Sequence, residues 1–136
     1  NSNIALKNTQ ENIISYNCET HINSYFLDIL KSIPKNKYDV IVSNPPYIPV
    51  DDINTLEHSV QIYDPKNALT DYGDGMTFYK RILTLSNQIL NKNGLIVLEF
   101  GTNLQKKQII NIFSKFKHEI INDITNSPRV ITLQQC

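Results

Sequence analysis

Residues 38–47 of the chain read YDVIVSNPPY. An apolar, largely β-branched run stops here at two successive prolines. This pattern predicts a buried strand over Tyr38–Ser43 that ends abruptly in a stiff loop, because proline cannot donate to a ladder and restricts the residue before it. In an open α/β sheet, ligands bind beyond the carboxyl ends of the strands. We therefore expect Asn44 and Tyr47 to lie where the chemistry takes place.

The loop Asn44-Pro45-Pro46-Tyr47 offers what is needed to hold a planar nitrogen for alkylation. Such a nitrogen is a poor nucleophile, and its two N–H bonds need acceptors. The Asn44 side-chain oxygen can accept one, and the Pro45 carbonyl, which the prolines orient, can accept the other. The ring of Tyr47 would cover the planar group and lie near a methylsulfonium cation. The alternative is a turn that merely ends the strand, with Tyr47 as a half-buried packing ring.

Further motifs follow in a defined order. After NPPYIP at 44–49 come YDPKNAL at 63–69, GDGM at 73–76, FYKRI at 78–82 and LEFG at 98–101. This combination resembles the HemK/PrmC-type S-adenosylmethionine-dependent protein-glutamine N-methyltransferases, which modify the glutamine of the Gly-Gly-Gln motif in peptide chain release factors. Arg129-Val130 also resembles the closing strand of that family. The first motif alone is shared with adenine-N6 methyltransferases, so the resemblance depends on the combination.

The resemblance implies a fold, a reaction and a set of site residues. The fold would be an α/β, Rossmann-like S-adenosylmethionine-dependent methyltransferase fold, of which this chain supplies the second half of the sheet with flanking helices. The reaction would be methyl transfer to the glutamine side-chain amide of a release factor, with S-adenosyl-L-methionine as cofactor. The implied catalytic residues are Asn44, Pro45, Pro46 and Tyr47. Asn44, Pro45, Tyr47 and Glu99 would bind the substrate.

The cofactor half of the family pattern is represented only in part. Residues 2–12 resemble a helix of that family. In the family this helix follows an acidic residue that holds the ribose hydroxyls of the cofactor, and the resemblance starts just after that acid. The glycine-rich loop is absent, because the four glycines lie at positions 73, 75, 94 and 101. Tyr25 stands where the family has a cofactor-binding aspartate, and Asn44 is the other cofactor-binding candidate. We expect residues 1–136 to be a partial methyltransferase domain without the N-terminal cofactor-binding strands and the helical substrate domain.

Composition argues against several classes of function. The 13 basic and 13 acidic residues balance, which speaks against a duplex-binding surface. Cys18 and Cys136, in a chain with no signal-like apolar start, imply reduced thiols and a cytoplasmic protein. The longest apolar runs have the length of strands, so we expect no membrane span. His21, His58 and His118 lack the spacing of metal ligands, so we expect no metal.

Periodicity and turn residues predict the other elements. The polar stretch 50–74 shows no period, so we expect a long loop that forms the wall admitting a protein substrate. The run LIVLEF at 95–100 predicts a second buried parallel strand, with Glu99 in the same layer as Asn44. Glu99 would orient the loop or substrate, or cap a helix starting near Asn103. Before Tyr38, the expected elements are a helix capped by Ser2 and running to about Ile14, a short strand at His21–Tyr25, and a helical or loop segment at Phe26–Leu30. After the polar stretch, we expect a helix from Phe78 that Asn93-Gly94 stops, and a helix over 104–116. The chain should close with strands at His118–Ile124 and Val130–Gln134 around Asn126-Ser127-Pro128.

Three interpretations of function stay open. The first is glutamine methylation of a release factor. The second is adenine-N6 methylation of nucleic acid, which uses the same four residues but requires a basic recognition element that the sequence does not show. The third is a non-catalytic fragment or split subunit that cannot bind cofactor alone. The strands absent beside Tyr38–Ser43 would leave its edge open, which predicts poor stability, self-association or pairing with a complementary fragment.

Overall fold

The computed structural model describes residues 2–135 of the chain. Contacts between residues divide the chain into two compact units, Asn1–Pro34 and Lys35–Cys136. The expectation that both belong to one partial domain stays a prediction.

The first unit begins with a capped helix. α1 spans Asn3–Ser15, and the Ser2 hydroxyl caps it by accepting from the backbone N–H of Ala5 at 3.3 Å. Just beyond its end, Asn17 has a φ of 53°, a left-handed conformation that asparagine visits more readily than most residues. The helix predicted from Ser2 to about Ile14 is confirmed.

The short strand predicted at His21–Tyr25 is wrong. Residue 21 lies in a turn and residues 22–28 have no regular secondary structure. A strand requires a neighbour that satisfies its backbone groups, and the described part of this unit contains no second strand. The following segment, Phe26–Leu30, is the expected loop, in which the Asp28 carboxylate accepts from the N–H of Leu30 at 3.1 Å.

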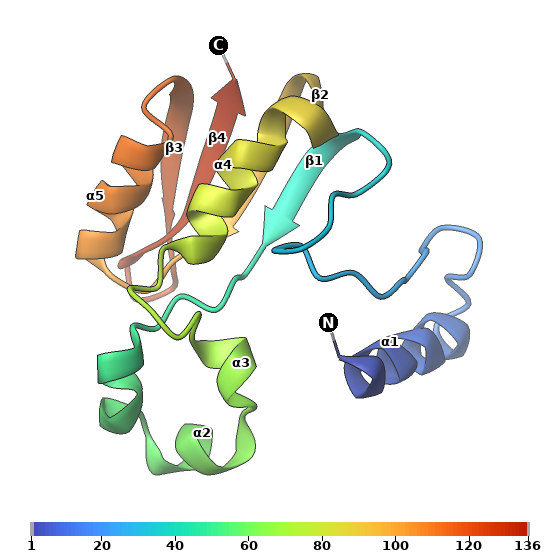
Figure 1. Cartoon of the computed structure of the whole chain (residues 1–136), viewed down its shortest axis with the longest axis horizontal. Coiled ribbons are helices and arrows are strands. Elements are labelled where there is room, and N and C mark those ends of the chain that lie inside the picture. The colour runs from blue at the N-terminus through green and yellow to red at the C-terminus, as the bar shows by residue number, and fades with distance from the viewer. Residues whose placement is uncertain (1, 136) are drawn as a thin grey trace. The chain divides into compact units, whose positions relative to one another are not determined.

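The second unit is built on a four-stranded sheet of order β1-β2-β4-β3 (Figure 1). β1 (Tyr38–Ser43) runs parallel to β2 (Leu90–Glu99). β4 (Pro128–Gln135) is antiparallel to β2 and forms a hairpin with β3 (Phe116–Asn122). The α/β class and the final hairpin predicted from the sequence are confirmed.

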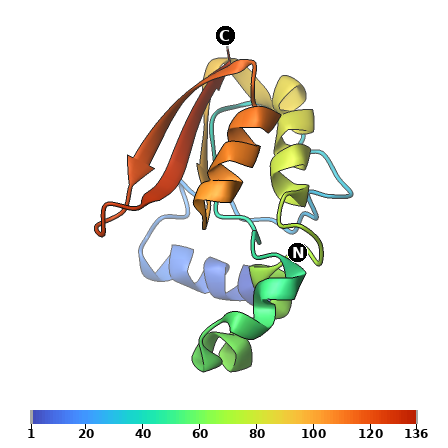
Figure 2. The same ribbon diagram turned by 90° about the vertical axis from the view of Figure 1, so that its left-hand side faces the viewer.

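Two helices cover one face of this sheet, as Figure 2 shows. They are α4 (Thr77–Ile89) and α5 (Asn103–Ile112). Because side chains alternate along a strand, every second residue of β2 and β4 points into this layer. The helix predicted from Phe78 has Ile82, Leu85 and Ile89 buried in this layer, whereas Phe78 is half-buried. The fully or nearly fully buried core consists of Met76, Tyr79, Ile82, Leu85, Ile89, Leu90, Ile96, Leu98, Phe100, Ile109, Phe113, Ile131 and Leu133.

β1 is an edge strand, and the prediction that it is buried is wrong. Val40 is 52% exposed and Val42 is 73% exposed. Both alternate with Ile41, which packs against the core, so they lie on the face opposite α4 and α5. An apolar run is typical of strands covered on both faces, and the described residues cover only one face of β1. Among the strands of residues 2–135, β1 pairs only with β2, so it lies at the edge of the sheet, as expected.

The stretch 50–74 is not a structureless loop. It contains three short helices: η1 (Val50–Thr55), α2 (His58–Tyr63) and α3 (Lys66–Leu69). Helices of this length complete too few turns to produce a recognisable period in the sequence. We call residues 49–75 the arm.

Asn93-Gly94 does not stop a helix. α4 ends at Ile89 and β2 begins at once with Leu90. Asn93 has a φ of 64° and lies in an irregular part of β2, where the register with β1 shifts between Tyr38 and Val40. The left-handed residue that suggested a helix end therefore belongs to a strand irregularity. In the part of the chain that the structure describes, none of the helices has the length and hydropathy that crossing a membrane requires.

Candidate active site

The candidate site lies at the edge of the sheet where β1 and β2 end. Parallel pairing sets Ser43 opposite Leu98, so Asn44 and Glu99 occupy neighbouring positions at the carboxyl ends of the two strands. The arm extends from this same edge (Figure 1). The register of the two strands therefore places Asn44 and Glu99 in the same layer, as the sequence predicted.

Two hydrogen-bond acceptors at the end of β1 are not engaged by other described residues. Asn44 is exposed, whereas Pro45 is buried and Pro46 is half-buried. Within residues 2–135, neither the Asn44 side-chain amide nor the Pro45 carbonyl has a hydrogen-bonding partner. The proline ring restricts the backbone here, and each of the two oxygens can accept a hydrogen bond.

Tyr47 is held by its hydroxyl. It donates to Glu99 Oε1 at 3.2 Å, while the Glu99 carbonyl accepts from the Tyr79 hydroxyl at 2.7 Å. Burial and then the neighbouring Glu99 carboxylate raise the pKa of Tyr47, and burial raises that of Tyr79. Both phenols therefore stay protonated at neutral pH and act as donors. Tyr47 is half-buried, as the alternative of a packing ring predicts, and its role in binding stays a prediction.

The alternative that Glu99 caps the following helix is wrong. The cap of α5 is Thr102, whose hydroxyl accepts from the backbone N–H of Gln105 at 3.2 Å. The Gln105 side chain reaches back to the N–H of Thr102 at 3.1 Å, which completes a capping box. The same side chain donates from Nε2 to the carbonyl of Tyr47 at 2.6 Å. Gln105 was not among the residues predicted for the site, although Thr102-Asn103-Leu104-Gln105 has the spacing of a capping box.

Arg129 links the final hairpin to this edge of the sheet. Its guanidinium donates to the Phe100 carbonyl at 3.3 Å and pairs with Asp123 at 3.3 Å. Hydrogen bonds from Thr125 and Ser127, together with Arg129, lower the pKa of Asp123 to about 2. Arg129 also opposes the rise in the pKa of Tyr47. The sequence marked Arg129 only as part of a motif and gave it no role.

The turn before α4 abuts the Tyr47 backbone. Asp71 accepts from the N–H groups of Gly73, Gly75 and Thr77 at 2.9–3.0 Å. Although partial burial opposes it, these hydrogen bonds lower the pKa of Asp71, which keeps the carboxylate charged. Gly75 has a φ of 78°, and a Cβ there would lie 2.1 Å from the Tyr47 carbonyl oxygen. Only glycine fits this position.

Tyr25, the candidate cofactor residue, belongs to the other unit. It is 57% exposed and lies in the irregular segment after α1. Its role as a cofactor contact stays a prediction.

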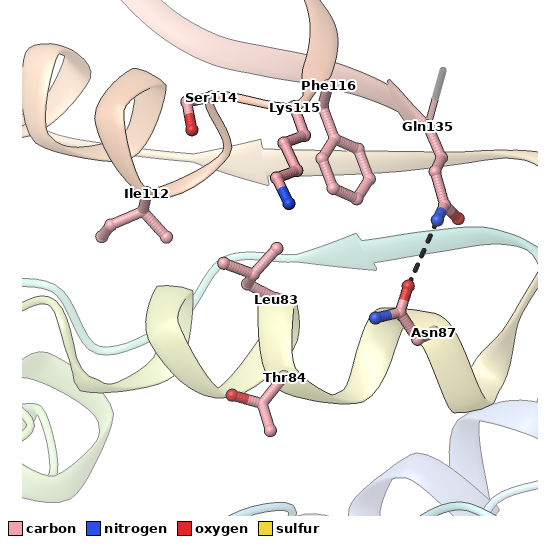
Figure 3. Close-up of a pocket in the computed structure, with 8 residues that line it drawn as sticks. All are labelled: Leu83, Thr84, Asn87, Ile112, Ser114, Lys115, Phe116 and Gln135. Carbon is pink, nitrogen blue, oxygen red and sulfur yellow. Dashed lines mark hydrogen bonds between the residues drawn. The ribbon is translucent and has the colours of Figure 1, made fainter.

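A pocket of 770 Å³ lies elsewhere in the second unit (Figure 3). Its lining comes from α4, the end of α5 and the ends of β3 and β4, and it includes none of Asn44, Tyr47 and Glu99. The amide of Gln135 donates across it to Asn87 at 3.2 Å. Within the described range, no cluster of three His, Cys, Asp or Glu side chains could hold a metal ion.

Comparison with known proteins gives consistent matches. A family model described as Eco57I restriction-modification methylase matches residues 1–130. A release factor glutamine methyltransferase of Clostridium botulinum is 37% identical over 94% of this chain and 47% of the relative. One from Fusobacterium nucleatum is 44% identical over 70% of this chain and 27% of the relative. A ribosomal protein uL3 glutamine methyltransferase of Francisella tularensis is 31% identical over 75% of this chain and 32% of the relative. The chain therefore spans half the length or less of these relatives.

The crowding at Gly75 generates a prediction about stability. Gly75→Ala should lower the free energy of unfolding by about 1–3 kcal/mol, because the methyl group meets the Tyr47 carbonyl at an unfavourable φ. Gly73→Ala is the matched control, since its Cβ would meet nothing closer than an Asp71 oxygen at 3.6 Å. Urea unfolding followed by circular dichroism measures both. Equal losses in the two variants would contradict this account of the turn.

Proposed function

Because this chain belongs to the methylase family whose model matches residues 1–130, and is of the HemK/PrmC type by its motifs and relatives, we propose that it methylates glutamine. The transfer would run from S-adenosyl-L-methionine to the side-chain amide of the Gly-Gly-Gln glutamine in peptide chain release factors. The mixed sheet with flanking helices is that of a Rossmann-like methyltransferase. The protein is a methyltransferase by family, and its substrate is the proposed part.

The observation that carries this proposal is the pair of acceptors at the end of β1 that no described residue engages. A primary amide presents two N–H bonds in one plane, and the Asn44 side-chain oxygen and the Pro45 carbonyl can accept one each. Pro45 and Pro46 restrict the backbone on both sides of the second acceptor. The substrate nitrogen is thereby oriented without being protonated, and its proton leaves to solvent after the transfer.

Tyr47 and Glu99 complete the proposed substrate site. With its hydroxyl fixed on Glu99 at 3.2 Å, the Tyr47 ring has a set orientation and can pack on the flat amide. We assign Glu99 the supporting role of orienting Tyr47. Positioning of this kind lowers the barrier by removing unproductive geometries from the bound state.

The fit to the cofactor is partial. S-adenosyl-L-methionine supplies an electrophilic methyl group when it is bound. Asn44 offers a polar contact and the Tyr47 ring a face for a sulfonium cation. At the position where the family has an aspartate for the cofactor, Tyr25 offers a phenol instead. This substitution supports the alternative that the chain acts as a subunit or fragment that does not bind cofactor alone.

Charge at the arm favours a protein substrate over nucleic acid. Between positions 49 and 75 the chain carries six Asp or Glu residues and one Lys. A phosphate backbone approaching this edge would meet repulsion instead of the basic contacts that dominate nucleic-acid affinity. Adenine-N6 methylation remains the second candidate because the family description concerns a restriction-modification methylase. The partner we propose is a release factor, with the cytoplasm as the place of action.

Substitution of Asn44 tests the proposed reaction. Asn44→Ala should reduce methyl transfer to a release factor by about 100- to 1,000-fold, because one of the two acceptors is lost. Asn111→Ala, an exposed asparagine on α5, is the control and should retain activity. Incorporation of labelled methyl groups is measured into a release factor, into protein uL3 and into adenine-containing DNA. Methylation of DNA alone would overturn the proposal, and methylation of uL3 alone would change the substrate.

Binding of the cofactor is tested separately by calorimetric titration with S-adenosyl-L-methionine. Tyr25→Asp should tighten binding by about tenfold, because it restores the carboxylate that the family has at this position, and a carboxylate can accept hydrogen bonds from the cofactor. Tyr16→Asp, an equally small change at a tyrosine that is 78% exposed in the same unit, should leave affinity unchanged. Absence of heat in all three proteins would favour the non-catalytic alternative.

The open edge of β1 gives a prediction about association. The isolated chain should self-associate through this strand or pair with a complementary fragment, because an edge strand with exposed valines can pair with another strand. Val42→Lys should shift the chain toward the monomer, whereas Val50→Lys, at an exposed valine of the arm, should not. Light scattering across a concentration series measures the mass. A wild-type chain that stays at 15.6 kDa at every concentration would contradict this expectation.

A further inference from the structure

We propose that Gln105 is the positioning residue that fixes the loop Asn44–Tyr47 for methyl transfer. The inference rests on the proposed function for the meaning of the loop, and on hydrogen bonds and burial for the role of Gln105. The Gln105 side chain is 5% exposed. It therefore acts on the site through the protein and not through contact with a ligand.

The orientation of the Gln105 amide is determined by its partners. Oε1 accepts two backbone N–H groups, from Gly101 at 2.9 Å and from Thr102 at 3.1 Å. Only the carbonyl end of an amide can accept these donors, so the NH₂ end must point the other way. That end donates to the Tyr47 carbonyl at 2.6 Å. One buried side chain thus joins the segment that follows β2 to the loop that follows β1.

The hydrogen bond between Gln105 and the Tyr47 carbonyl lies in a space too narrow for additional side-chain atoms at the neighbouring glycines. A Cβ at Gly75 would lie 2.1 Å from the Tyr47 oxygen and 3.3 Å from Gln105 Nε2. A Cβ at Gly101 would lie 2.9 Å from the Tyr47 ring and 3.1 Å from Gln105 Oε1. Both glycines let the two loops approach until the amide bridges them. The Tyr47 backbone has little room to shift while the bridge is in place.

The loop is consequently fixed at both ends. Ser43 is held by its pairing with β2, and Tyr47 is held by Gln105. Between these points, Pro45 and Pro46 have restricted φ angles, so few backbone rotations remain. The hydrogen bond from Gln105 to the Tyr47 carbonyl, two residues beyond Pro45, therefore sets the Asn44 side chain and the Pro45 carbonyl in place. A misplacement of about 1 Å at such acceptors can reduce a rate by about 100-fold.

Gln105→Glu isolates the bridge from the helix cap. A carboxylate keeps an oxygen that accepts from Gly101 and Thr102, but it replaces the NH₂ donor with a second acceptor facing the Tyr47 carbonyl. Thr102→Val is the matched control, because it removes the cap of the same helix and leaves the bridge intact. Thermal unfolding of both variants shows whether the fold is retained.

Two measurements test the role. We expect Gln105→Glu to lower kcat for glutamine methylation by about 10- to 100-fold with little change in the KM for the cofactor. Relative to wild type, its activity should recover as the pH falls and the new carboxyl gains a proton to donate. The second measurement needs no activity: hydrogen exchange of the Ile48 N–H, which donates to the Leu69 carbonyl at 2.9 Å, should become about tenfold faster in Gln105→Glu. Thr102→Val should leave both kcat and the exchange rate of the Ile48 N–H unchanged.

The outcomes separate the two proposals. A wild-type kcat retained in Gln105→Glu, or Ile48 exchange equal to wild type, would overturn the positioning role. Wild-type protein that does not methylate glutamine would overturn the proposed function, and the exchange rates would still decide whether Gln105 holds the loop. Equal kinetic losses in Gln105→Glu and Thr102→Val would assign the effect to the helix cap and reject the bridge.

Discussion

The parallel pairing of β1 with β2 is the constraint on which the site depends. Because both strands run in the same direction, their carboxyl ends meet at one edge of the sheet, with Ser43 opposite Leu98. The loop that begins at Asn44 then lies beside the segment that follows Glu99. An antiparallel pair would have placed these segments at opposite edges, where neither the Tyr47–Glu99 bond nor the Gln105 bridge could form.

Rigidity at this edge comes from several short contacts that converge on Tyr47. Its hydroxyl is fixed by Glu99, its carbonyl by Gln105, and its ring lies against Gly101. Burial raises the pKa of the Tyr47 phenol, so it remains a donor across the neutral range. By contrast, the acceptors at Asn44 and Pro45 have no partner within residues 2–135. The structure thus combines a fixed framework with two acceptors that no described residue engages, and this arrangement supports the proposed recognition of a substrate amide.

The same four-residue loop is compatible with a protein amide or with an adenine amine, since both present two N–H bonds on a planar nitrogen. Discrimination must come from the surroundings of the loop. The arm that extends from the same edge is acidic, with six Asp or Glu residues and one Lys between positions 49 and 75. Such a surface is suited to a polypeptide and opposes a phosphate backbone.

The sequence alone determined the α/β class, the strand at Tyr38–Ser43, the helix cap at Ser2, the final hairpin and the set of motifs, because these depend on local periodicity, proline chemistry and turn residues. It misjudged the burial of β1 and the strand at His21–Tyr25, since both depend on whether a neighbour exists to cover or pair them. It also gave no role to Gln105, Arg129 or Gly75. Their roles depend on contacts with residues 25 or more positions away, such as the Tyr47 carbonyl and the Phe100 carbonyl. Only the tertiary structure brings those segments together, because strand pairing and core packing, and not local sequence, decide which loops become neighbours.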